Sequence, residues 1–217
     1  MEKIINTSTS EVYGTAQKIP IDEKHVLNAQ SPYAATKISA DQLSMSYYRS
    51  FGLPITILRP FNTFGPRQSL RAAIPTIISQ IVMGKKNIKL GNVKATRDFT
   101  YVSDTVEGYI KTIRNKKCVG ETINLGTGSE FSIKKIVELV SSITKKDIKI
   151  ISDKKRIRPK KSEVNRLVSD NTKAKKLLKW KPIYVKEKGF KDGLKKTIDW
   201  FCDKENLKLY KSNLYNL

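Results

Sequence analysis

Tyr33 and Lys37 stand four residues apart in the segment SPYAATK, residues 31–37. A helix is predicted to begin near Pro32, and positions four apart lie on the same face of a helix. An ammonium group beside a phenol favours the phenolate, the form that can accept a proton. The pair therefore indicates a general base. A solvated helix pair without catalytic role is the alternative, because this spacing is common by chance.

Polar side chains also follow a predicted strand, Lys3–Ser8, upstream of this pair. Thr9 precedes Tyr33 by 24 positions and Glu11 precedes it by 22, with Ser10 between them. Open α/β sheets place their ligand crevice at the carboxyl ends of the strands. We therefore expect these three side chains at such a crevice, and a surface carboxylate at a strand end is the alternative for Glu11.

The elements that must position these residues alternate between strand and helix signals, which predicts an α/β protein with a mostly parallel sheet. The helix that starts at Pro32 should run to about Ser50, stopped by Gly52 and Pro54. Further helices are predicted over Ala73–Met83, Asp104–Arg114, Ile133–Ile143, Asn171–Leu178 and Lys188–Cys202, and further strands over Pro54–Arg59, Asp98–Val102, Thr122–Leu125 and Asp147–Ile151.

Several single residues and segments carry weaker expectations. The basic, irregular stretch Ser152–Leu167 is predicted to be a loop that crosses a functional region. Asp104 is expected to cap the helix that it begins. His25 lies in a polar loop and is expected at the surface, whereas Trp180 is expected to be a packing anchor. The charged tail after Asp203 is expected to fray.

The composition excludes several classes of protein. The 217 residues are 39% hydrophobic and 29% charged, as in soluble globular proteins. No apolar run is long enough to span a bilayer, and no secretory signal is visible, so a cytoplasmic location is the default. Two cysteines, Cys118 and Cys202, and a single histidine predict neither a disulfide framework nor a metal site.

The net charge of +22 raises the question of nucleic acid binding. The basic residues occur mostly as pairs or triplets, many of them on predicted helices opposite apolar positions, and none alternates with aromatic residues. We therefore predict solvated lysine-rich faces rather than a nucleic-acid-binding surface. Such a positive field would still attract an anionic substrate.

Three further segments complete a family pattern: RPFNTFGPR at residues 59–67, RDFTYV at residues 97–102, and Arg158-Pro159. With the two segments above, they resemble the extended short-chain dehydrogenase/reductase family, the NAD-dependent nucleotide-sugar epimerases and dehydratases. The resemblance covers the chain from about Ile4 to Phe201. Among the family's members, the sequence is most like 4,6-dehydratases that act on nucleotide-activated N-acetylglucosamine in surface polysaccharide biosynthesis.

The resemblance implies an α/β fold, the C-terminal part of a Rossmann-like parallel sheet with a smaller α/β substrate-binding region. Residues 1–65 would form the second half of the Rossmann-like domain. Residues 66–217 would mainly bind the substrate, with late strands and helices returning to the main sheet. The family's glycine-rich NAD turn does not precede Thr9, and the Gly-Thr-Gly at residues 126–128 is rejected as a substitute. We therefore expect the NAD-binding segment to be missing, or separately encoded, and the chain alone to be inactive or nearly so.

The chemistry that the resemblance implies has three stages. Tyr33 would take the proton from the sugar O4 as hydride passes from C4 to NAD, and Thr9 would hydrogen-bond the same oxygen. Glu11 would then remove the C5 proton as water leaves C6, and hydride would return to C6. Lys37 would hold the nicotinamide ribose and tune Tyr33, so both residues also count as cofactor-binding. Ser10 stands where some members carry an acidic aspartate, and it is expected to contact the substrate.

The remaining site residues are expected to bind ligands. Pro60 would pack near the nicotinamide and Asn62 would bind the substrate's phosphates. Arg97 and Arg158 would hold the diphosphate, because a guanidinium group matches two adjacent phosphate oxygens. For both arginines, and especially for Arg158, simple surface charge is the alternative.

Other activities stay open at this stage. A nucleotide-sugar 4-epimerase or a UDP-glucuronate decarboxylase would share most of these residues, and a non-catalytic remnant or binding module is the alternative of another class. We expect a nucleotide-diphosphate sugar as the partner and no membrane. In intact relatives the resemblance also implies a homodimer that pairs through the helix carrying Tyr33 and Lys37.

Overall fold

Three parallel strands form the main sheet of the computed structural model, in the order β1–β2–β6. They are β1 (Ile4–Thr7), β2 (Ile55–Pro60) and β6 (Thr122–Leu125), and the structure describes residues 2–210. The first five residues of β2 are buried, as expected of a central parallel strand covered on both faces. Strand β1 pairs with β2 on one side, and no described strand pairs with its other edge. The predicted α/β fold with a parallel sheet is confirmed.

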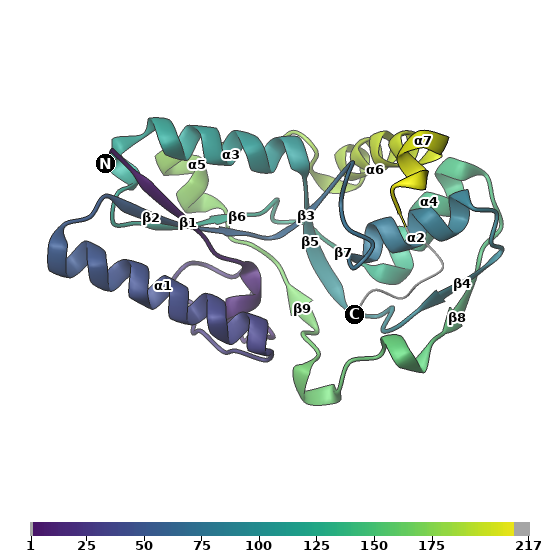
Figure 1. Cartoon of the computed structure of the whole chain (residues 1–217), viewed down its shortest axis with the longest axis horizontal. Coiled ribbons are helices and arrows are strands. Elements are labelled where there is room, and N and C mark those ends of the chain that lie inside the picture. Colours follow the sequence, from purple (N-terminus) through teal and green to yellow (C-terminus); the bar gives the residue numbers. More distant parts are fainter. Residues whose placement is uncertain (1, 211–217) are drawn as a thin grey trace.

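Helices cover both faces of this sheet (Figure 1). Helix α1 (Pro32–Phe51) lies on one face, and α3 (Val102–Arg114) and α5 (Thr172–Leu178) lie on the other. Helix α1 begins after Ser31, because the Ser31 hydroxyl accepts a hydrogen bond from the Ala34 N–H at 3.1 Å and so caps the first turn. The helix ends at a glycine in the left-handed conformation, which costs glycine little.

A second sheet lies beside the first and links it to the rest of the chain (Figure 1). Strand β3 (Asn62–Phe64) pairs in parallel with β5 (Thr96–Tyr101), which also pairs with the antiparallel β7 (Glu130–Ser132) and the short parallel β9 (Arg166–Leu167). Because β3 follows directly after β2, the chain passes from the main sheet into the second sheet at this point. The sequence patterns did not indicate β3, β7 or β9.

The largest hydrophobic core belongs to this second region. Helices α2 (Ala73–Val82), α4 (Ile133–Thr144) and α6 (Lys186–Cys202) pack around a cluster of buried aliphatic and aromatic side chains. A two-stranded parallel sheet, β4 (Asn87–Leu90) with β8 (Lys149–Ser152), completes the region. These three helices begin or end within two residues of the predicted bounds, because their apolar faces repeat at helical spacing.

Short elements fill the predicted loops. The 3-10 helix η1 (Ser10–Tyr13) follows β1, and η2 (Lys116–Cys118) precedes β6. The basic stretch before β9 contains η3 (Lys154–Arg156) and η4 (Lys160–Ser162). The tail predicted to fray forms helix α7 (Lys204–Lys208), which overturns that prediction for its first residues; residues 211–217 lie outside the described part of the chain.

Two predictions for single residues are wrong and one is confirmed. His25 is 7% exposed rather than at the surface, because Gln17 N–H donates to its Nε2 at 3.1 Å and its ring packs edge-on against Tyr13. Asp104 does not cap α3; its carboxylate accepts from the backbone N–H groups before α6. Trp180 is fully buried and donates its Nε1–H to the Asp104 carbonyl at 2.8 Å, as a packing anchor should.

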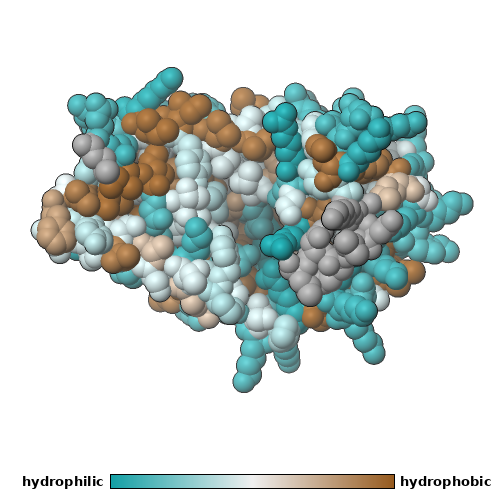
Figure 2. Space-filling model, viewed as in Figure 1, coloured by the Kyte–Doolittle hydropathy of each residue, from teal (hydrophilic) through white to brown (hydrophobic). Residues whose placement is uncertain are grey.

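Among residues 2–210, no helix is long and apolar enough to cross a membrane. A row of hydrophobic surface does run across the upper left of Figure 2, over α3. It consists of Val106, Ile110 and Ile113, which are 49%, 40% and 60% exposed. These positions recur every three or four residues, so they form one apolar stripe along the helix.

A buried carboxylate joins three distant segments. Asp98 on β5 is fully buried and accepts hydrogen bonds from Thr127 N–H and Gly128 N–H, both at 2.8 Å, from the Thr127 hydroxyl at 2.6 Å, and from Ser169 N–H at 3.1 Å. Burial raises the pKa of Asp98 to about 6, although these four donors act in the opposite direction. Any side chain at Gly126 would collide with Ser169, 2.4 Å from an added Cβ. The turn after β6 is therefore fitted closely around this carboxylate.

Replacing Asp98 with asparagine should destabilise the fold by about 2–4 kcal/mol, because an amide NH₂ cannot accept from the Gly128 and Ser169 N–H groups. The pH dependence should change as well. A folded-state pKa of about 6 lies above the ordinary value of 3.8, so the contribution of this carboxyl to the free energy of unfolding increases as pH falls from 7 to 4 and is lost as pH rises through 6. Urea unfolding of both proteins at several pH values measures this. Equal stabilities, or identical pH profiles, would contradict the assignment.

Candidate functional site

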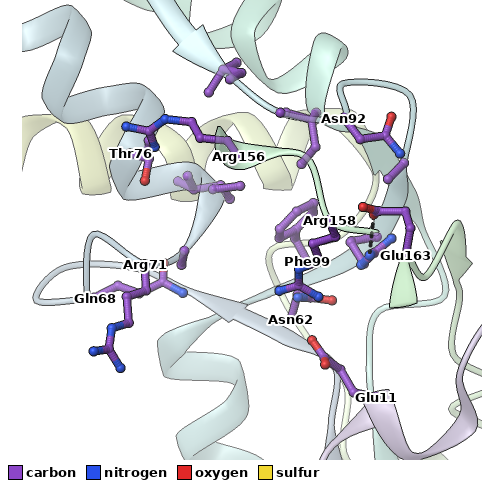
Figure 3. A pocket seen from close by; sticks show the side chains of 18 of the residues that line it. Glu11, Asn62, Gln68, Arg71, Thr76, Asn92, Phe99, Arg156, Arg158 and Glu163 are labelled. Carbon is purple, nitrogen blue, oxygen red and sulfur yellow. Dashed lines mark ion pairs between the residues drawn. The ribbon is translucent and has the colours of Figure 1, made fainter. Parts of the chain in front are cut away.

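A cleft of about 430 Å³ lies among η1, β3, β5, the start of α2 and the basic stretch before β9. Figure 3 shows its lining side chains, which include four of the residues predicted from the sequence: Glu11, Asn62, Arg97 and Arg158. The structure therefore brings together residues that are up to 147 positions apart in the chain. Such a volume is typical of small-molecule sites.

The cleft is rich in positive charge. Arg97 and Arg158 share it with Arg71 and Arg156, and the carboxylates of Glu11 and Glu163 are the acidic groups in its lining. Four guanidinium groups against two carboxylates favour an anionic ligand, and guanidinium groups bind phosphate oxygens through paired N–H donors. The charge excess therefore indicates a ligand with phosphate groups.

Arg97 is held in place before any ligand binds. It donates through Nη1 to the neighbouring Thr96 carbonyl at 2.9 Å, and its Nη2 lies 3.9 Å from Glu163 Oε1. Burial lowers the pKa of Arg97 below its ordinary value, and the charges of Glu163 and Glu11 oppose that effect. A buried guanidinium group with one distant carboxylate partner keeps N–H donors available for a ligand.

The strand end before η1 places a threonine and a glutamate in one turn. Thr9 precedes η1, and its Oγ1 accepts from the Glu11 N–H at 3.2 Å. The hydroxyl proton of Thr9 thus remains available to a ligand oxygen. Ser10, in the same turn, is 2% exposed and does not line the cleft, so the substrate contact expected for it stays a prediction.

Two amide oxygens in the cleft have no hydrogen-bond donor among the described residues, Asn62 Oδ1 and Gln68 Oε1. Gln68 donates its Nε2 to the Thr63 carbonyl at 2.7 Å, which fixes its amide with the oxygen as the unpartnered atom. Buried acceptors without a donor are costly unless a ligand supplies one. Sequence reasoning missed Gln68, whose only signal was its position directly after the motif at residues 59–67.

The tyrosine and lysine lie apart from this cleft. Tyr33 is 51% exposed, and the Lys37 Nζ lies 6.0 Å from the centre of its ring. Lys37 also donates to the Thr7 carbonyl at the end of β1, at 2.9 Å, so the pair stands at the carboxyl end of that strand. Neither residue lines the cleft that contains Glu11. Pro60 does not line it either; it ends β2 opposite Leu125 of β6.

The fit to a dinucleotide is partial. Tyr33 and Lys37 are accessible side by side on α1, as a ribose contact requires. The Gly-Thr-Gly turn at residues 126–128 cannot hold a pyrophosphate, because Asp98 already takes the N–H groups of Thr127 and Gly128. The N–H groups of this turn bind Asp98, which supports the prediction that the turn is not the cofactor's glycine-rich turn.

Comparison with known proteins places the chain among nucleotide-sugar enzymes. The family model of GDP-mannose 4,6 dehydratase matches residues 1–196. A UDP-glucuronate 4-epimerase from Thermodesulfobacterium geofontis is 36% identical over 98% of this chain and 62% of its own length, and the human dTDP-D-glucose 4,6-dehydratase is 30% identical over 98% and 59%. The chain spans about three fifths of the length of these relatives.

The fold comparison agrees. The crystal structure of UDP-glucuronic acid 4-epimerase from Bacillus cereus, in complex with UDP-glucuronic acid and NAD, matches 96% of this chain and 62% of its own, with a TM-score of 0.84 and 32% identity. The arrangement of strands is therefore shared with enzymes of this kind. The chain belongs to the GDP-mannose 4,6-dehydratase family, within the short-chain dehydrogenase/reductase group of nucleotide-sugar dehydratases and epimerases.

Proposed function

We propose that this chain carries the substrate site and acid–base residues of an NAD-dependent nucleotide-sugar 4,6-dehydratase, which forms a 4-keto-6-deoxy sugar. The observation that carries the proposal is the position of Glu11, whose carboxylate lines the same cleft as Arg97 and Arg158. A nucleotide sugar with its diphosphate on the two arginines would extend its sugar toward this carboxylate. A base at that point suits the proton abstraction that precedes loss of water.

Each residue of the site has a distinct part in this proposal. Tyr33 accepts the proton of the sugar O4, and the free hydroxyl proton of Thr9 is donated to the same oxygen. Bound NAD would supply the hydride acceptor for C4 and would return that hydride to C6 once water has left. Glu11 takes the C5 proton, which a neighbouring ketone makes acidic. Ser10, next to Glu11 in the chain, is proposed to contact the substrate. Lys37 holds the ribose beside Tyr33.

The substrate is proposed to be a nucleotide-activated N-acetylglucosamine. The sequence of residues 61–65 and 158–164 supports this choice, and the two unpartnered amide oxygens of Asn62 and Gln68 are suited to hydroxyl or amide N–H donors on a sugar. Arg97 and Arg158 hold the diphosphate, with Arg71 and Arg156 adding positive charge around it.

The cofactor site is proposed to be completed by further polypeptide. The free edge of β1 and the apolar stripe on α3 lie together at the side of the main sheet (Figures 1 and 2). A parallel strand added to β1, with a helix against that stripe, would cover both. On α1, exposed Leu43, Tyr47 and Phe51 recur every fourth residue, which supports pairing of two copies through that helix.

A 4-epimerase is the second candidate reaction, and its support is the likeness to enzymes of that name. An epimerase needs Tyr33 but has no use for a base at C5, so the carboxylate of Glu11 in the cleft favours the dehydratase. A decarboxylase of UDP-glucuronate is a further alternative, because decarboxylases of this family can carry the glutamate too. A non-catalytic binding module would keep the cleft and lose the reaction.

Product analysis decides between these reactions. The chain is incubated with NAD+ and UDP-N-acetylglucosamine, and because weak cofactor binding keeps turnover low, products are measured by mass spectrometry after long incubation. We expect a product that has lost one water. Glu11→Gln should lower its rate at least about 100-fold, since general base catalysis contributes that much, while Glu138→Gln on α4 should not.

An epimer of unchanged mass would replace the dehydratase by the epimerase. Binding of the nucleotide sugar without any product, in a sample that also binds NAD+ by calorimetry, would support the non-catalytic module.

The diphosphate contact is tested separately with UDP, which needs no cofactor. Arg97→Lys replaces a planar fork of donors with a single ammonium group, so UDP affinity should fall about tenfold, or about 1.4 kcal/mol. Arg114→Lys on the exposed end of α3 is the matched control and should bind as the unaltered chain does. Calorimetric titration measures both. Equal affinities for all three proteins would remove Arg97 from the site.

A further inference from the structure

One glutamine joins the two parts of the chain that carry the proposed site. Gln30 accepts a hydrogen bond at Oε1 from the Thr15 N–H, and its Nε2 donates to the carbonyls of Lys161 and Glu163 at 3.1 and 3.4 Å. Since its oxygen faces a donor and its nitrogen faces two acceptors, the orientation of the amide is fixed. A single side chain thus ties together backbone segments about 150 residues apart.

The far segment is the strap, defined here as residues 157–165, which runs along the cleft before β9. It carries Arg158 and Glu163, both of which line the cleft. Thr15 adds to its attachment, because Thr15 Oγ1 donates to the Glu163 carbonyl at 3.5 Å and accepts from the Asn165 N–H at 3.3 Å. The strap is therefore held by Thr15 and Gln30 at the end that bears Glu163.

The near segment carries the acid–base residues. Thr15 stands four residues after Glu11, just beyond η1, and Gln30 directly precedes Ser31, whose hydroxyl caps α1 and so fixes the start of the helix that bears Tyr33. Gly14 lies against the same amide: a Cβ there would be 2.8 Å from Gln30 Oε1. Movement of Gln30 would therefore displace both Thr15, after η1, and Ser31, at the start of α1.

We propose that Gln30 is a positioning residue that couples ligand binding by the strap to the placement of Glu11 and Tyr33. The ligand in question, a nucleoside diphosphate on Arg158 and Arg97, rests on the proposed function. Binding there orders the strap. Because the Gln30 amide is hydrogen-bonded to both the strap and Thr15, the ordered strap also restricts Thr15 and the cap of α1. Because such coupling is reciprocal, a firmly held loop also improves binding of the diphosphate.

Hydrogen exchange of the whole chain tests this directly, with and without UDP. Without ligand, Gln30→Ala should raise exchange at least about tenfold in residues 11–16 and in the strap together, since both lose a shared anchor. Gln30→Glu still accepts from Thr15 but cannot donate to the strap, so it should loosen the strap alone. Gln17→Ala, an exposed glutamine of the same loop, is the control and should change neither segment.

With UDP, the unaltered chain should be protected in both segments and Gln30→Ala in the strap alone. Unchanged exchange of residues 11–16 in Gln30→Ala, or protection of both segments by UDP in that variant, would overturn the coupling. If UDP fails to bind the unaltered chain, the proposed function fails and the coupling to a diphosphate fails with it, whereas the comparison without ligand still decides whether Gln30 holds the two segments together.

Discussion

The buried carboxylate of Asp98 is the constraint on which the rest of the cleft depends. Alternate residues of a strand point to opposite sides, so Arg97 faces the cleft while Asp98 faces inward. Burying an ionisable group is costly unless donors surround it, and here four donors from the turn after β6 and from Ser169 do so. Strand β5 is thereby locked to two other segments, and the guanidinium of Arg97 is placed with it. The same bonds explain why a glycine-rich turn next to the cleft holds a carboxylate of the protein and not a phosphate.

The buried ion pair of Asp41 and Arg59 positions the proposed acid–base residues, as Asp98 positions the cleft. Asp41 stands one helical turn after Lys37, is fully buried, and accepts hydrogen bonds from the Ser8 hydroxyl at 2.8 Å and from Arg59 Nε at 3.0 Å. Arg59 in turn donates to the hydroxyl of Tyr13 at 2.9 Å. Helix α1, strands β1 and β2, and η1 are thus joined by one polar network. Breaking such a pair costs about 3–5 kcal/mol, because it leaves a buried charge alone, so the spacing between Tyr33 and Glu11 is set by a strong constraint.

The sequence predicts well whatever depends on local periodicity and motif spacing. The bounds of α1 follow from Ser31, Pro32 and Gly52, and the apolar face of α4 repeats at helical spacing. What it misses depends on partners far away in the chain. His25 looked like a surface residue in a polar loop, yet backbone groups satisfy its ring nitrogens in the interior. Asp104 stands where a capping residue is expected, but its acceptors serve residues 183 and 184. Gln30 has no local signal and Gln68 only its position after the motif at residues 59–67, because their partners are a distant carbonyl and a cleft that the fold supplies.

The two parts of the proposed chemistry are unequally enclosed by this chain. The cleft with Glu11 has its arginines in place and its strap attached, whereas Tyr33 is half exposed on α1 beside Lys37. Of the two proposed parts, the chain therefore encloses the one assigned to the substrate and leaves the one assigned to the O4 proton on an open face of α1.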